Sequence, residues 1–210
     1  MLQYLEWAKE HQSYIVSVIA LSGCAGLRIL ESCYIREQDI DFDLKTVRIT
    51  SVEPYHVPKT LRSHRTIPVG DFVLDQLRWA IEHRAGKRHR GFISVSPKTG
   101  EPWTVDQQHC APCQTMRRYL AKHAPKGTPR ITSRNLRTSF ISHARMVLGI
   151  NPLALRMYVG HTDGSVLEDH YTWWSVEFLR REVVEKAEGW VGKSECDSPH
   201  SSDSSRASGT

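Results

Sequence analysis

The sequence has no apolar run long enough to cross a membrane. Its longest candidate, residues 14–21 (YIVSVIAL), is far shorter than the roughly 18 residues of a membrane-spanning helix, and we interpret it as a buried helix. Cysteine is also scarce, with five in 210 residues, and the first residues lack the pattern of a secretory signal. These absences argue against a disulfide framework and favour a reducing compartment. We therefore expect a cytoplasmic protein that has no membrane as a partner.

The sequence also lacks a strong charge of one sign. Lys and Arg number 28 against 23 Asp and Glu, a formal net charge of +5, which permits a nucleic acid partner without requiring one. The placement of the basic residues is more informative, because they gather in residues 59–65, 83–90, 117–126 and 130–145. Such runs are usually solvated surface, but together they could contact a phosphate backbone if the fold brought them close to one another.

No internal repeat is present, and a composition of 40% hydrophobic and 24% charged residues is ordinary for a globular domain. Apolar spacing and capping residues predict helices over residues 2–21, from 27 or 28, over 72–84, from 104, from Thr132 or Ser133, from Asn151–Pro152 and over 175–186. Alternating apolar residues predict a hairpin over 40–50 and a third strand over 65–69. The fold class is therefore α+β: mostly helical, with one small three-stranded antiparallel sheet.

A possible zinc site occurs at His109, Cys110 and Cys113, where a C-x-x-C pair follows a histidine and His123 lies further on. No second C-x-x-C or H-x-x-x-H pair is present, and the segment falls within the helix predicted from residue 104. The sequence has no carboxylate cluster for Mg²⁺ either. We therefore predict no metal.

Two segments of the first half carry residues suited to phosphate chemistry. In residues 24–31 (CAGLRILE) a glycine just before a helix lets the backbone turn tightly, and Glu31 can pair with Arg28 one turn later. Lys59 lies in the basic loop before the strand over 65–69, where we expect the tip of a hairpin that this strand completes. Taken alone, each residue has an ordinary surface interpretation.

Two segments of the second half are similar in kind. Arg134 and Arg137 are three residues apart on a predicted helix, so both guanidinium groups leave the same face and can hold one phosphate from two sides. His161 follows a glycine, and Tyr171 comes ten residues later. A tyrosine near a histidine is, by itself, most often a core or interface residue.

The joint order of these residues resembles the tyrosine recombinase (phage integrase) family along nearly the whole chain before the tail. Residues 24–31 match a family motif like A-T-G-L-R-x-x-E, and Lys59 corresponds to the family's hairpin lysine. Residues 134–138 (RNLRT) match H-x-L-R-H/R-T, and residues 159–161 (VGH) with Tyr171 match L-G-H followed nine or ten residues later by tyrosine.

The resemblance implies the DNA breaking-rejoining enzyme fold and site-specific DNA recombination, as in the integration of a mobile element. Tyr171 would be the nucleophile that becomes joined to the DNA 3′ phosphate, and Lys59 the general acid for the departing 5′ oxygen. Arg28, Arg137, His161 and Arg134 would stabilise the phosphoryl transition state. The expected partners are double-stranded DNA and further copies of the chain, as a tetramer on DNA and nucleoid-associated when bound. Neither a cofactor nor a small-molecule substrate is implied.

One position departs from the family pattern. Arg134 stands where the family usually has His or Lys, and an arginine cannot accept a proton near neutral pH. This departure affects the expected rate of strand cleavage more than the resemblance to the family. Two other interpretations remain open: a type IB topoisomerase-like enzyme that relaxes supercoils, and a catalytically impaired remnant that binds DNA.

The expected domain organisation is a catalytic domain over residues 1–192 and a disordered Ser-rich tail over 193–210. We expect the helical DNA-clamping domain that precedes the catalytic domain in the family to be absent, and hence weak, salt-sensitive DNA binding by this chain alone. The apolar stripe of the last predicted helix could dock on a neighbouring protomer, as the resemblance implies, or pack on the chain's own core.

Overall fold

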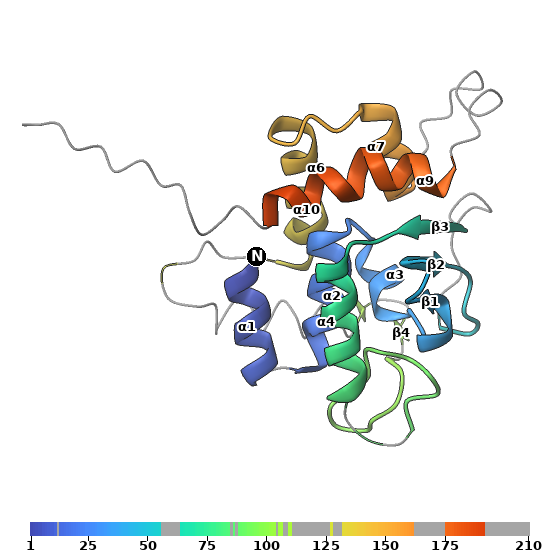
Figure 1. The fold of residues 1–210 in the computed structure, drawn as a ribbon. Coiled ribbons are helices and arrows are strands. Elements are labelled where there is room, and N and C mark those ends of the chain that lie inside the picture. Colours follow the sequence, from blue (N-terminus) through green and yellow to red (C-terminus); the bar gives the residue numbers. More distant parts are fainter. Residues whose placement is uncertain are drawn as a thin grey trace, which may run out of the picture.

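The structure is a computed structural model. It describes residues 1–11, 13–55, 64–84, 86, 88–103, 105–106, 109–110, 127, 132–161 and 175–191. Helices make up most of this part of the chain, and Figure 1 shows the three-stranded sheet at one side of them. None of these helices combines the length and the apolar character of a membrane span.

The first half begins with α1 (Leu2–His11) and continues with the 3₁₀ turn η1 (Ser13–Ile15), α2 (Val16–Ile19), the π-helix η2 (Ala20–Cys24), α3 (Ile29–Cys33) and η3 (Glu37–Asp39). The prediction of one helix over residues 2–21 is wrong in its continuity. Residues 14–21 are buried on all sides, whereas α1 buries only Tyr4, Leu5 and Ala8. A segment buried all round passes through the core, whereas α1 packs on the core with one face only, so one continuous straight helix cannot serve both segments.

The predicted hairpin and third strand form the expected sheet. Strands β1 (Ile40–Asp41), β2 (Thr46–Ile49) and β3 (Arg65–Pro68) pair antiparallel in the order β1-β2-β3, with Val47 opposite both Ile40 and Ile67. Helix α4 (Asp71–Glu82) follows the sheet as predicted and packs against α2. Sheet and α4 together carry one side of the core.

The helix predicted from residue 104 is wrong at its start, where β4 (Val105–Asp106) and β5 (His109–Cys110) pair antiparallel. Residues 111–126 lie outside the described ranges. The reason is local: Val105 is β-branched, which favours extended backbone, and positions 108 and 109, one helical turn later, are polar. The segment therefore has no apolar stripe that a helix could bury.

The later helices begin where their caps predicted. Helix α6 (Ser133–Met146) starts after Thr132, whose hydroxyl accepts a hydrogen bond from the Asn135 amide, and α7 (Pro152–Val159) starts after Asn151, whose side chain accepts from two amides. The C-terminal helix consists of α9 (Val176–Leu179), the π-helix η5 (Arg180–Glu185) and α10 (Lys186–Val191). In Figure 1 these helices group on one side of the molecule.

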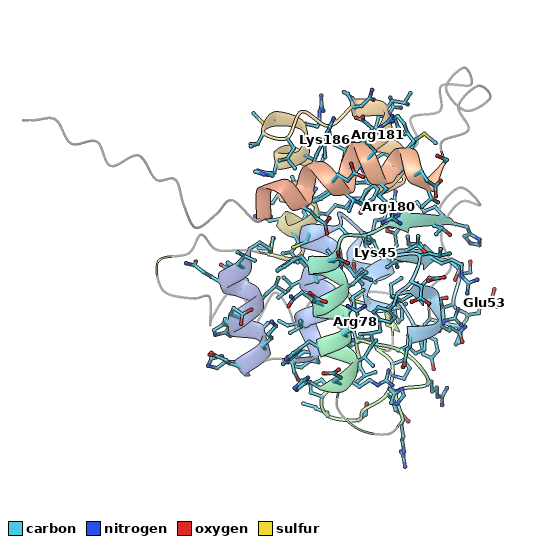
Figure 2. All side chains as sticks on the ribbon, in the orientation of Figure 1. Lys45, Glu53, Arg78, Arg180, Arg181 and Lys186 are labelled. Carbon is cyan, nitrogen blue, oxygen red and sulfur yellow. The ribbon has the colours of Figure 1, made fainter. Side chains whose placement is uncertain are left out.

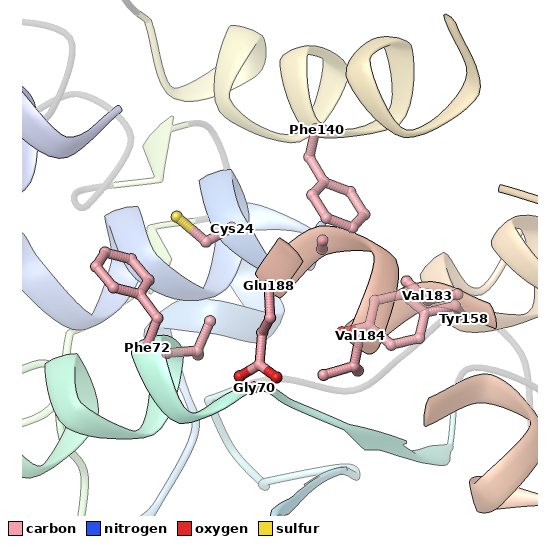
Figure 3. Close-up of a pocket in the computed structure, with 10 residues that line it drawn as sticks. Cys24, Gly70, Phe72, Phe140, Tyr158, Val183, Val184 and Glu188 are labelled. Atoms are coloured by element: carbon pink, nitrogen blue, oxygen red, sulfur yellow. The ribbon is translucent and has the colours of Figure 1, made fainter. Parts of the chain in front are cut away.

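In this structure of a single chain, the C-terminal helix packs on the chain's own core, which is one of the two predicted placements. Leu179, Val183 and Val184 are buried among the residues of the sheet, α4, α6 and α7. Arg180 donates to the carbonyl oxygens of the turn between β1 and β2, near Lys45 (Figure 2). Glu188 reaches Gly70 and accepts a hydrogen bond from the first amide of α4 (Figure 3).

Two buried clusters make up the core. One joins the sheet, α4, α6, α7 and the C-terminal helix, and the other joins α1, α2 and residues 92–103. Phe72, Trp79 and Cys24 contact both clusters. A mostly apolar pocket lies where Cys24, Phe72, Phe140, Tyr158 and Glu188 approach one another (Figure 3).

Candidate active site

Arg28 is held at the start of α3. Gly26, two residues earlier, has φ +67°, a left-handed conformation that glycine adopts without steric cost. Arg28 then occupies the N-cap, where its amide donates to Glu31 Oε2 (2.9 Å) and its Nη1 to Glu31 Oε1 (2.9 Å). The predicted Arg28–Glu31 pair is therefore present, and it fixes the arginine against its own helix.

Glu31 also pairs with a second arginine, Arg65, at the start of β3. Arg65 Nη1 and Nη2 donate to the two carboxylate oxygens at 3.1 and 3.0 Å. Only 2% of the Glu31 side chain and 10% of the Arg65 side chain are exposed. Burial alone would raise the pKa of Glu31, but the hydrogen bonds and charge of Arg65, together with the hydrogen bonds of Arg28, lower it below its usual value.

Sequence reasoning did not single out Arg65, which appeared only as the end of a basic run and the start of a strand. A signal was available. An arginine that begins a strand whose last three residues are apolar (RTIPV) and that points to the buried side of the sheet needs a buried partner. Glu31, 34 residues earlier, is that partner.

The end of α7 leaves carbonyl oxygens that the backbone does not satisfy. Gly160 has φ +69° and its amide donates to Met157 O, while the His161 amide donates to Arg156 O. These two bonds form a Schellman motif. The carbonyl groups of Tyr158, Val159 and Gly160 lie beyond them and need other donors.

Three arginines supply those donors. Arg65 Nε donates to Tyr158 O (3.1 Å) and its Nη2 to Val159 O (3.2 Å), while Arg28 Nη2 donates to Gly160 O (2.7 Å). Arg137 Nη2 donates to Val159 O (2.8 Å), and its Nη1 to Gly26 O (2.7 Å). The negative end of the α7 dipole favours this arrangement of cations. We call Arg28, Arg65 and Arg137 the arginine cluster.

The two arginines of α6 lie in different surroundings. The helix buries Leu136, Phe140 and Ala144, which lie at four-residue intervals on one face, and Arg137 leaves it toward Gly26 and Val159. Burial first, then the charges of Arg28 and Arg65, lower the pKa of Arg137 to about 10, while Glu31 opposes the shift. Arg134, one turn earlier, is exposed, and its side chain forms no hydrogen bond within the part of the chain that the structure describes.

His161 follows the α7 end directly and is exposed beside the arginine cluster. Partial burial, then the positive charges of Arg137, Arg28, Arg156 and Arg65, lower the pKa of His161 below 6.5. The imidazole is therefore mostly neutral at pH 7, and one ring nitrogen can donate a hydrogen bond while the other accepts one.

The structure thus brings together Arg28, Arg137 and His161 from three distant parts of the sequence, and it places Arg134 on the helix that carries Arg137. Lys59 and Tyr171 lie outside the described residues, Lys59 between β2 and β3 and Tyr171 between His161 and the C-terminal helix. Within the described ranges, no three His, Cys, Asp or Glu side chains are arranged to hold a metal ion. Cys113 and His123 of the considered zinc site fall outside those ranges.

Comparison with known proteins gives a family match and several similar folds. The model of the phage integrase family matches residues 1–176. The integrase of the Tn1549 transposon, solved in complex with transposon right end DNA, has 21% identity and a TM-score of 0.58 over 85% of this chain and 61% of that one. XerA recombinase has 16% identity and a TM-score of 0.55 over 86% of this chain and 60% of that one.

A lambda integrase dimer bound to a COC′ core site has 17% identity and a TM-score of 0.50 over 83% of this chain and 57% of that one. At these identities the likeness shows the fold alone: a mostly helical domain with a small antiparallel sheet. The matched region thus corresponds to 57–61% of the length of these three structures. No curated protein gives a significant match.

Proposed function

Since the chain belongs to the phage integrase family, we propose that it is a site-specific DNA recombinase that cuts and rejoins strands through a phosphotyrosine link. In this proposal Tyr171 is the nucleophile and Lys59 the general acid. Arg28, Arg137, His161 and Arg134 stabilise the phosphoryl group. The observation that carries the proposal is the convergence of Arg28, Arg137 and His161 on the C-terminal end of α7.

The reaction needs this kind of convergence. A phosphodiester repels nucleophiles through its negative charge, and that charge grows on the non-bridging oxygens in the transition state. A guanidinium group has five N–H donors. In the described residues Arg28 uses one on Glu31 and one on Gly160, and Arg137 uses one on Gly26 and one on Val159. Each arginine is oriented by its partners and keeps donors for phosphoryl oxygens.

The bond changes balance without a cofactor. The Tyr171 oxygen attacks phosphorus and forms the phosphotyrosine bond, while the bond from phosphorus to the 5′ oxygen breaks and Lys59 donates the proton to that oxygen. A free 5′ hydroxyl from another strand reverses the step. Neutral His161 donates to a phosphoryl oxygen through one ring nitrogen and accepts the proton lost by Tyr171 through the other. Arg134 adds a donor and cannot accept the tyrosine proton.

The proposed partners follow from the same chemistry. The substrate is double-stranded DNA, and exchange of strands between two duplexes calls for several copies of the chain, which we propose to be four. The DNA named in the solved structures, a transposon end and a phage core site, supports a mobile element as the source of the target.

The test is covalent capture from a pool of nicked duplexes with a randomised core. A nick next to the cleaved phosphate lets the short 5′ product diffuse away, so the phosphotyrosine adduct accumulates. Wild type is expected to select a sequence and form a denaturation-resistant adduct at Tyr171, located by peptide mapping. Tyr171→Phe is expected to lose the adduct entirely, and Tyr55→Phe, whose hydroxyl contacts only Arg90 among the described residues, is expected to keep it.

Other results would support the other classes. Adducts without any sequence selection, together with relaxation of a supercoiled plasmid, would favour a topoisomerase-like enzyme. Retention of DNA without any adduct would favour a DNA-binding remnant. Either result contradicts site-specific recombination by this chain.

A further inference from the structure

We propose that Arg65 is a positioning residue of this site. It fixes the side chains of Arg28 and His161 relative to each other without itself touching DNA. The proposal rests on the proposed function, because it assigns Arg65 a role in the same strand cleavage. Three segments are involved: β3, the start of α3 and the end of α7.

The contacts of Arg65 connect all three segments. Its two terminal nitrogens hold both oxygens of Glu31, the residue that also holds Arg28. Its Nε and Nη2 hold the carbonyl oxygens of Tyr158 and Val159, directly before Gly160 and His161. The side chain is only 10% exposed, so its place is behind Arg28 and His161 rather than on the DNA-facing surface.

The close fit at Gly160 gives independent support. A Cβ added to Gly160 would lie 2.8 Å from Arg65 Nη1 and 2.9 Å from Cζ. The guanidinium therefore packs directly on the α7 turn from which His161 emerges. Any displacement of Arg65 changes the support beneath that turn.

A lysine at position 65 would keep the charge and lose this arrangement. The planar guanidinium makes a two-pronged contact with the carboxylate and reaches two carbonyl groups, whereas an ammonium is a single point charge on a flexible stem. Arg65→Lys therefore separates geometry from charge.

The chain offers a matched control at Asp39. This carboxylate is also buried, and Arg36 Nε and Nη2 hold its two oxygens at 2.9 and 3.2 Å. Among the described residues, Arg36 contacts none of Arg28, Arg137 and His161. Asp39, like Glu31, has a second arginine partner, because Arg48 Nη2 lies 3.3 Å from its Oδ1. Arg36→Lys thus weakens a comparable two-arginine contact to a buried carboxylate away from the site.

The experiment measures DNA affinity and the first-order rate of adduct formation separately, with the captured nicked duplex at saturating protein. Arg65→Lys is expected to lower the rate constant roughly 10²-fold, the scale of a misplaced catalytic group, and to change the affinity less than about threefold. Arg36→Lys is expected to change neither by more than about threefold. A merely structural role predicts equal effects of the two substitutions at a temperature where both variants are folded.

A modified leaving group locates the defect. With sulfur in place of the bridging 5′ oxygen, the departing thiolate needs no proton, so a Lys59→Ala variant should recover its rate. Arg65→Lys should not recover, because its defect lies in the groups around the phosphoryl oxygens. Recovery of Arg65→Lys to the wild-type rate would overturn the proposal.

Hydrogen exchange tests the same contact without activity. The Gly160 and His161 amides, which close the α7 end, are expected to exchange roughly tenfold faster in Arg65→Lys and unchanged in Arg36→Lys. Absence of adducts from wild type would refute the proposed function. The hydrogen-exchange measurement would still test whether Arg65 stabilises the end of α7. Unchanged exchange together with an unchanged cleavage rate would overturn the positioning role.

Discussion

The carboxylate of Glu31 lies between Arg28 and Arg65, which reach it from the same helix and from β3. Its burial would be costly without these partners, and the two arginines would repel each other without it. Sequence reasoning found the Arg28–Glu31 pair from its spacing of three residues. It missed Arg65 because a contact across 34 residues depends on the register of the sheet, which no local pattern gives.

Replacement of Glu31 by Gln should destabilise the fold by roughly 3 kcal/mol at pH 7, the lower end for a broken buried pair because Arg28 is partly exposed. The pKa of Glu31 is lowered by folding, so its stabilising contribution is present above the ordinary value of 4.5 and is lost as the pH falls through the folded-state pKa. Urea unfolding of wild type and Glu31→Gln from pH 7 to pH 3 measures the difference between them, which should shrink below pH 4.5.

Arg78→Ala is a suitable control, because its only ion pair among the described residues is with the exposed Asp75. The opposite result is that the free energies of unfolding of wild type and Glu31→Gln differ by the same amount across the pH range. That result would contradict a folded-state pKa of Glu31 below its usual value.

Among the elements, α7 orders the site through its last turn. Its start was predictable from Asn151 and Pro152, whose capping chemistry is local. The role of its end was not, because the Schellman motif only leaves carbonyl groups open, and the arginines that fill them come from residues 28, 65 and 137. The prediction of a helix from residue 104 failed for a local reason instead. Residues 105–110 are too short and too polar a segment for apolar periodicity to distinguish a helix from a strand.

Gly160→Ala should destabilise the protein more than Gly149→Ala does. Both glycines have left-handed backbone, φ +69° and +58°, which costs alanine roughly 1–2 kcal/mol. A Cβ at Gly149 meets nothing within 4 Å, whereas one at Gly160 meets the Arg65 guanidinium. Thermal unfolding of the two variants measures the excess due to that contact.

The same substitution in an Arg65→Ala background separates backbone strain from collision. There the excess of Gly160→Ala over Gly149→Ala should disappear. An excess that persists without the Arg65 side chain would place its cause elsewhere.

At the scale of the whole molecule, the C-terminal helix joins the halves of the chain. It covers the core with Leu179, Val183 and Val184, and it reaches the sheet through Arg180 and α4 through Glu188. The apolar stripe of this helix was visible in the sequence, but a stripe alone does not predict the surface against which it packs. The fold class could be predicted because periodicity and turn residues are local, whereas the docking of this helix required the assembled core.

Val183→Asp should therefore unfold the protein, at a cost of about 3 kcal/mol or more, because it places a carboxylate in the core. Val147→Asp, at a residue that is 63% exposed after α6, should leave the melting temperature nearly unchanged. Circular dichroism melts and sedimentation velocity measure stability and mass. A stable Val183→Asp monomer formed from a wild-type oligomer would instead place this helix on a neighbouring protomer.

Among proteins descended from this chain, we expect a substitution at position 65 or at position 160 alone to be disfavoured. A lineage that gains a side chain at position 160 collides with the guanidinium, and a lineage that loses the arginine leaves Glu31 and two carbonyl groups short of donors. We expect the two positions to covary: large side chains at 160 should occur only where a smaller residue stands at 65, with a new partner for Glu31 in the same genes.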